Sequence, residues 1–162
     1  YPNRYLGQFG IEITGLMSEQ WSYRWFGEFA ATNCEFWKSE ENFNCAYNHF
    51  TYQTGYRYRG RVVGHNSDND SRVATIGLML VDDRETQWQA LIRFGKLNRG
   101  GIPDARNSLT PTPQEIASID LTHSRRFHYG QIRMGLGLER IDDALSGQTI
   151  DDTRFYLEWR SN

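Results

Sequence analysis

The amino-acid sequence predicts an all-β protein, and more specifically an antiparallel transmembrane β-barrel. Apolar and polar residues alternate along one segment after another, which is typical of strands with one apolar and one polar face. Several of these segments are much longer than the roughly five or six residues usual in soluble sheets. Charged residues lie in the middle of the polar faces, and aromatic residues lie toward the ends of the apolar faces. Lipid-facing barrels with a polar lumen show this distribution.

About eight strands follow from the alternation. In chain order they are predicted at residues 4–13, 19–32, 50–60, 72–80, 86–95, 118–123, 131–140 and 154–160. The last segment is the clearest, because Phe155, Leu157 and Trp159 share one face while arginine and glutamate occupy the other. Helical periodicity is limited to residues 112–119, where Pro113 predicts a single turn of helix.

A soluble β-sandwich also alternates, and the residues alone leave it open as the alternative. The two folds differ in what covers Trp25, Ile92 and Leu136, which is lipid in a barrel and a second protein layer in a sandwich. The longest apolar run, residues 76–81, is far shorter than the roughly 20 residues of a membrane-spanning helix. The net charge of -2 excludes a general electrostatic attraction to nucleic acid.

The chain has two cysteines, Cys34 and Cys45, which either form one disulfide or remain two separate thiols. Their position on both sides of a polar, turn-like segment favours the disulfide and therefore an oxidising compartment. Neither cysteine belongs to a CxxC motif, so we expect no metal site. We also expect no cofactor.

The segment Gly64–Arg72, GHNSDNDSR, is the densest polar motif and has three interpretations. It is a hydrated turn closed by asparagine and aspartate, a binding surface, or a catalytic cluster. The catalytic interpretation uses His65 and Ser67, in an order similar to that of the outer-membrane phospholipases, with Asn69 following. Against it, the segment is rich in turn formers and shows no oxyanion donor. The segment is a poor match to a calcium-binding loop, because it lacks the glycine and the glutamate of such loops.

The order of three motifs resembles the Wzi capsule-assembly family. YRYRGR and GHNSDNDSR lie within Gly55–Arg72, and LNRGG ends the segment Trp88–Gly101. Trp21–Cys34 and the terminal RFYLEWRSN are also similar. Members of that family are outer-membrane β-barrels of Gram-negative bacteria that help to hold capsular polysaccharide at the cell surface. They are considerably longer, so the resemblance implies that residues 1–162 are part of a single outer-membrane β-barrel domain, namely its C-terminal portion.

The resemblance implies a lectin-like protein without enzymatic activity, which binds capsular polysaccharide and assembles or anchors the capsule. Guanidinium groups, amides, carboxylates and aromatic rings are the groups that recognise acidic sugars. The candidate binding residues are Tyr58, Arg59, Arg61, His65, Asn66, Asp68, Asn69, Asp70, Arg72 and Arg99. We expect a monomeric barrel in contact with outer-membrane lipid. The alternatives are a phospholipase-like enzyme using His65 and Ser67, and a general porin whose arginines favour anions.

Overall fold

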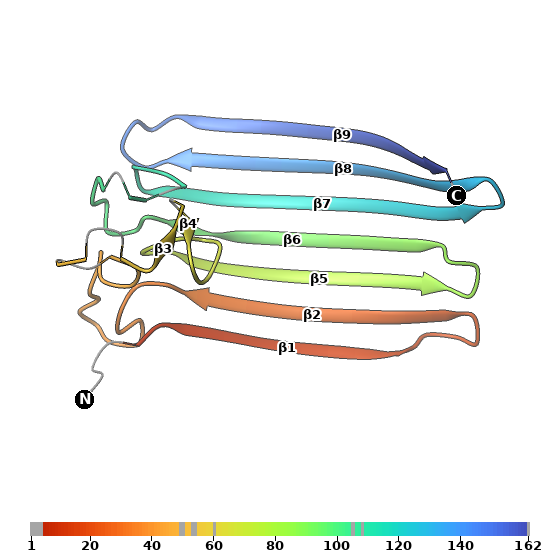
Figure 1. The fold of residues 1–162 in the computed structure, drawn as a ribbon, viewed down its shortest axis with the longest axis horizontal. Helices are drawn as coiled ribbons and strands as arrows, with labels where there is room; N and C mark the ends of the chain where they lie inside the picture. Colours follow the sequence, from red (N-terminus) through yellow and green to blue (C-terminus); the bar gives the residue numbers. More distant parts are fainter. Residues whose placement is uncertain are drawn as a thin grey trace.

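A computed structural model describes residues 5–48, 51–52, 55–59, 61–104, 106–107 and 109–161. Within them, seven strands form one antiparallel sheet in which neighbours in space are also neighbours along the chain (Figure 1). The strands of this sheet are β1 (Gly7–Leu16), β2 (Trp21–Ala31), β5 (Arg72–Asp82), β6 (Gln87–Leu97), β7 (Gln114–Phe127), β8 (Gly130–Asp143) and β9 (Thr149–Ser161). A separate small hairpin pairs β3 (Arg57–Tyr58) with β4 (Arg61–Val62).

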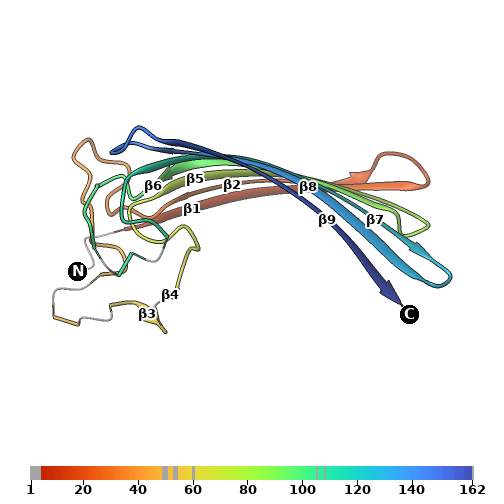
Figure 2. The same cartoon turned by 90° about the horizontal axis from the view of Figure 1, so that it is seen from above.

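The sheet is open and curved, with β1 at one edge and β9 at the other (Figure 2). All strand pairs are antiparallel, which confirms the all-β, antiparallel prediction. The seven long strands replace the predicted eight, because the described residues of 50–60 do not join this sheet.

In the described residues, no helix is long and apolar enough to cross a membrane.

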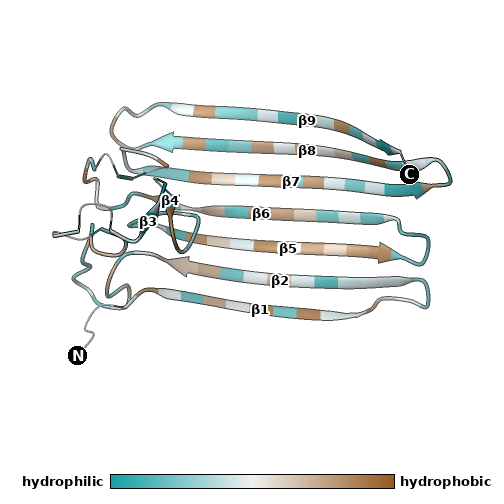
Figure 3. Ribbon diagram, viewed as in Figure 1, coloured by the Kyte–Doolittle hydropathy of each residue, from teal (hydrophilic) through white to brown (hydrophobic). Residues whose placement is uncertain are grey.

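The register of the strands collects the apolar residues on one face of the sheet. One row across the sheet consists of Trp25, Leu78, Ala90, Leu121, Leu136 and Phe155. The alternation of brown and teal along each ribbon in Figure 3 follows from this arrangement. Ile92 is 43% exposed and Leu136 is 42% exposed, so no second layer of the described chain covers this face. The described residues therefore supply no second sheet of the kind that a soluble sandwich requires.

The long connections gather at one end of the sheet. Residues 32–71 join β2 to β5, residues 98–113 join β6 to β7, and residues 144–148 join β8 to β9. The opposite end has only the short turns 17–20, 83–86 and 128–129 (Figure 1). We call the described parts of 32–71 and 98–113 the loop cap. The buried apolar residues also lie at this end, among them Ala31, Cys34 and Tyr47.

Two local predictions are wrong. Among the described residues of 50–60, only Arg57 and Tyr58 are in a strand, because the chain turns at Gly55, whose φ is 55°. A Cβ atom there would lie 2.1 Å from the carbonyl oxygen of Tyr47, so the turn needs glycine. Residues 114–119 are not helical but form the start of β7, where pairing with β6 and β8 on both sides outweighs the local signal of Pro113.

Candidate functional site

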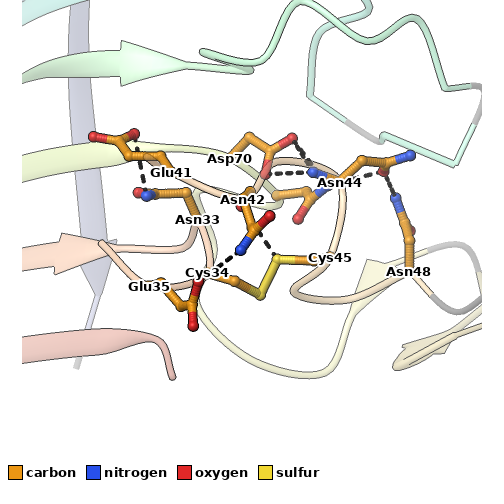
Figure 4. The surroundings of a disulfide bond; sticks show 10 residues. Asn33, Cys34, Glu35, Glu41, Asn42, Asn44, Cys45, Asn48 and Asp70 are labelled. Atoms are coloured by element: carbon orange, nitrogen blue, oxygen red, sulfur yellow. Dashed lines mark hydrogen bonds between the residues drawn. A yellow bond between two sulfur atoms is a disulfide. The ribbon is translucent and has the colours of Figure 1, made fainter. Parts of the chain in front are cut away.

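The loop cap is tied together at its base by a disulfide between Cys34 and Cys45, which are 11 positions apart (Figure 4). The backbone of Cys34 also exchanges two hydrogen bonds with Asn42, at 3.1 and 3.2 Å. The Thr32 N–H donates to the Ser71 carbonyl oxygen at 2.8 Å, which joins the two ends of the 32–71 connection. The cap is therefore a cross-linked structure above the ends of β2 and β5.

A buried ion pair joins the β3–β4 hairpin to the polar motif. The Arg57 guanidinium donates to both carboxylate oxygens of Asp68, at 2.7 and 3.0 Å. Both side chains are almost fully buried, with 4% and 1% of their surfaces exposed. This bidentate contact fixes the hairpin relative to the sheet, since Asp68 lies four residues before the start of β5.

Asp70 occupies a second buried position in the same motif. Its carboxylate accepts the Asn44 N–H at 2.7 Å, and its own carbonyl oxygen accepts the Arg99 N–H at 2.9 Å. Burial raises the pKa of Asp70 to about 6, although the Asn44 hydrogen bond and the nearby Arg99 charge oppose the increase. The side chain of Asn69 is also buried, and its amide donates to Asn44 at 3.1 Å.

Glu41 of the loop cap neutralises two of the predicted binding arginines. Its carboxylate accepts from Arg72 at 2.6 Å and from Arg99 at 2.5 Å. Arg72 donates in addition to the Phe36 carbonyl oxygen at 2.6 Å. Both guanidinium groups are thus engaged in holding the cap to the first residue of β5 and to the end of β6.

Four of the predicted residues are instead exposed. Tyr58 is 67% exposed, and the Arg59 guanidinium lies 5.3 Å from the centre of its ring. Arg61 follows in β4, and Asn66 lies in the next turn, both on the surface. The hairpin and this turn therefore present two cations, an aromatic ring and an amide to solvent.

His65 and Ser67 do contact each other, although they lie in a turn and not in a strand. The Ser67 hydroxyl lies 2.6 Å from Nδ1 of His65, and Nε2 of His65 lies 3.3 Å from Glu28 in β2. Nδ1 also accepts the Ser67 N–H at 3.2 Å. The ring proton of a neutral imidazole is therefore on Nε2, where it is donated to Glu28.

The ten predicted residues thus divide by environment. Asp68, Asn69 and Asp70 are buried, Arg72 and Arg99 pair with Glu41, and His65 is half-buried beside β2. Glu41, Arg57 and Glu28 are not among the ten predicted residues, and each of them contacts a partner in another part of the chain. The one signal for Glu41 was an acidic segment between two cysteines. Among the residues that the structure describes, no group of three His, Cys, Asp or Glu side chains is arranged to hold a metal ion.

Comparison with known proteins gives two matches. A family model described as capsule assembly protein Wzi matches residues 1–152. The solved structure of Wzi, described as an outer-membrane protein involved in group 1 capsule assembly in Escherichia coli and as a carbohydrate-binding β-barrel, superimposes with a TM-score of 0.75 at 17% identity. The superposition covers 97% of this chain and 34% of that one. No curated protein matches.

The two matches agree with the three sequence motifs and with the open antiparallel sheet. The structural match identifies the open sheet as part of a β-barrel wall, because a seven-stranded piece of a barrel has two free edges. The chain spans about a third of the length of the matched structure. The family model covers nearly the whole chain, which confirms the resemblance found in the three motifs. The chain belongs to the Wzi capsule-assembly family.

Proposed function

We propose that this chain is part of an outer-membrane barrel of a Gram-negative bacterium that binds acidic capsular polysaccharide and anchors the capsule at the cell surface, without chemical turnover. The observation that carries the proposal is the exposed pair Tyr58 and Arg59, with Arg61 on the adjacent strand, at the end of the sheet where the long loops gather. The family match supports capsule assembly as the biological setting.

The outer face of the sheet supports the location in a membrane. Its apolar rows end, on the side of the loop cap, in charged pairs that belong to the same face. Lys96 pairs with Glu115 at 2.5 Å, and Arg140 pairs with Asp151 at 2.8 Å. All four side chains are more than half exposed. An apolar band bordered by charges is the pattern of a barrel wall that passes from acyl chains into the headgroup region.

The chemistry of the hairpin supports an acidic sugar polymer as the ligand. Aromatic rings pack against the C–H faces of sugars, and guanidinium groups bind carboxylates with two parallel hydrogen bonds. Tyr58, Arg59 and Arg61 offer both kinds of group within a few residues. Contacts of this kind are individually weak, and a repeating polymer that makes many of them is held by avidity.

The buried and ion-paired residues of the motif hold the hairpin and the loop cap in place. Asp68 holds Arg57 of β3, and Glu41 holds Arg72 and Arg99. We assign these residues the role of positioning the exposed cations at the rim. In this proposal, His65 and Asn66 contact ligand from the turn that follows the hairpin.

The test is retention of an acidic polysaccharide on the immobilised full-length protein. The double variant Arg59→Ala, Arg61→Ala should weaken retention about three- to tenfold, since each exposed charged contact contributes about 1 kcal/mol or less. Higher salt should weaken the wild type in the same direction. Arg84→Ala is the matched control, because Arg84 is also exposed but lies in the short turn at the opposite end of the sheet. Equal retention by the double variant and the wild type would contradict the proposal.

The contact between Ser67 and His65 favours one alternative function, a lipase that uses Ser67 as its nucleophile. A serine is activated in this way when it lies beside a histidine that a carboxylate orients. Glu28 alternates along β2 with the apolar residues Gly27 and Phe29, so it lies on the polar face and not on the apolar one. Ser67 is only 6% exposed. A membrane lipid on the apolar face does not reach it. Lipase activity in detergent that disappears in Ser67→Ala would establish the enzymatic alternative.

A further inference from the structure

A second candidate site lies on the polar face of the sheet, below the turn 64–67. The structure has a hollow of about 400 Å³ there, bounded by β2, β5, β6, the start of β7 and the loop cap. A volume of this size is at the lower end of the roughly 300–1,000 Å³ found for small-molecule sites. Its polar side chains are Glu28, His65, Asn66, Ser67, Thr75, Gln89 and Arg93.

Arg93 is the cation of this hollow, and its neighbours do not neutralise it. Its register partners on both sides, Thr75 and Ser118, carry no charge. The next carboxylates on the polar face, Asp120 and Glu139, lie 3.7 and 3.9 Å from Arg154 of β9. In the part of the chain that the structure describes, no ion pair joins Arg93 to a carboxylate.

Glu28, the carboxylate of the hollow itself, is occupied by another partner. It faces Nε2 of His65 at 3.3 Å, and His65 is in turn held by Ser67. Glu28 is therefore engaged with His65, and Arg93 remains as the group available to an incoming anion. The exposed residue Asn66 also lines the hollow.

One wall of the hollow is apolar. The ring of Phe26 fills the space above Gly77, where an added Cβ atom would lie 2.2 Å from it. Gly77 is thus the residue that lets the ring lie against the sheet. Leu91 and Leu109 extend the same wall. A cation, amides and an apolar wall in one hollow are the combination that recognises a sugar with a negative charge.

We propose that this hollow binds one carboxylate-bearing sugar unit, a uronic acid or a pyruvyl ketal, with the carboxylate on Arg93. Asn66 and Gln89 bind its hydroxyl groups, and the C–H face of the sugar lies against Phe26. The inference rests on the proposed function and names the chemical feature of the polymer that is recognised inside the barrel. A singly charged carboxylate fits better than a phosphate dianion, because Glu28 on the same wall repels the second charge.

The experiment measures binding of four small probes to the full-length protein in detergent by isothermal titration calorimetry. The probes are glucuronic acid, pyruvylated galactose, glucose and inorganic phosphate. Binding of at least one acidic sugar, with no binding of glucose, supports the inference, and which of the two binds identifies the source of the carboxylate. Arg93→Ala should weaken that binding at least tenfold, and Arg93→Lys should restore part of it, because lysine keeps the charge but loses the bidentate geometry. Arg84→Ala should leave it unchanged.

Three results would overturn the inference. These are equal binding of glucose and glucuronic acid, stronger binding of phosphate than of either acidic sugar, and an Arg93→Ala variant that loses thermal stability while its affinity for glucuronic acid is unchanged. The last result would make Arg93 an ion-pair partner within the fold. In each case, retention of the polymer by the exposed hairpin is measured separately with the double variant Arg59→Ala, Arg61→Ala. A result against binding in the hollow can therefore be distinguished from a result against the proposed function.

Discussion

At the scale of single residues, the polar motif works mainly as a scaffold. Its composition indicated a polar site, but whether each side chain is exposed, buried or paired depends on partners elsewhere in the chain. Arg57, Glu41 and Asn44 come from the preceding loop and contact Asp68, Arg72 and Asp70 respectively. A sequence pattern gives no such pairing across a long connection, so it could not separate the exposed cations from the paired ones.

The Arg57–Asp68 pair gives the first prediction. Arg57→Ala leaves Asp68 as a buried charge without its cation, which costs about 3–5 kcal/mol. We expect the loop cap to open and become sensitive to protease, with a lower apparent stability in urea. Arg126→Ala is the control, because Arg126 contacts Glu85 at the same 2.7 Å but both side chains are more than half exposed. Such exposed pairs contribute about 0–1 kcal/mol. Equal protease sensitivity of the two variants would contradict the scaffold role.

Asp70 gives a prediction about pH. Its pKa is raised in the folded protein from 3.8 to about 6, so between these values the folded state binds more protons than the unfolded state. The contribution of Asp70 to stability therefore decreases as the pH rises through this window and stays low above it. Asp70→Asn should remove this decrease and make the loop cap more resistant to protease at pH 7.5. A variant with the same profile between pH 4 and 6.5 as the wild type would show that Asp70 is not the group responsible.

At the scale of strands, the sequence was most informative where one face of a segment is apolar and the other is polar. The period of two located all seven strands of the sheet because apolar and polar residues alternate along each of them. It failed in residues 50–60, where tyrosines at alternate positions imitate a strand. There the positive φ angles of Gly55 and Arg59, 55° and 50°, turn the chain twice within five residues. Backbone reversals of this kind leave the side-chain pattern unchanged, so the pattern alone did not reveal them.

Ala90 and Gln89 give a prediction for the two faces of β6. Ala90 lies in the central row of the apolar face, between Leu78 and Leu121, and Gln89 points to the polar face. Ala90→Arg should destabilise the protein in bilayers by about 2–4 kcal/mol, the cost of an arginine near the bilayer midplane, whereas a residue facing the lumen has no such cost. Gln89→Arg is the matched variant, with the same side chain one position away. Unfolding titrations in lipid vesicles that gave the same loss for both variants would contradict the assignment of faces.

At the scale of the whole molecule, the sheet is one sector of a larger wall. In the described chain β1 and β9 each have a neighbour on one side only. A barrel in lipid must satisfy the backbone groups of every strand, so both edges need partner strands. This chain covers only 34% of the matched structure, so a protein of that length has further residues that can form these partner strands. The sequence predicted the kind of wall, but closure depends on strands outside it.

The distribution of loops gives the last prediction. Barrels of the outer membrane have short periplasmic turns and longer extracellular loops, so the loop cap, the Tyr58 hairpin and the turn 144–148 should all face the outside of the cell. A peptide tag inserted between Leu145 and Ser146 should then be labelled by antibody on intact cells. The same tag between His128 and Tyr129, in the short turn at the opposite end, should be labelled only after permeabilisation. Both sites are in exposed turns, where insertions are tolerated. The reverse labelling would place the arginines of the hairpin in the periplasm, where they could not hold a capsule on the outer surface.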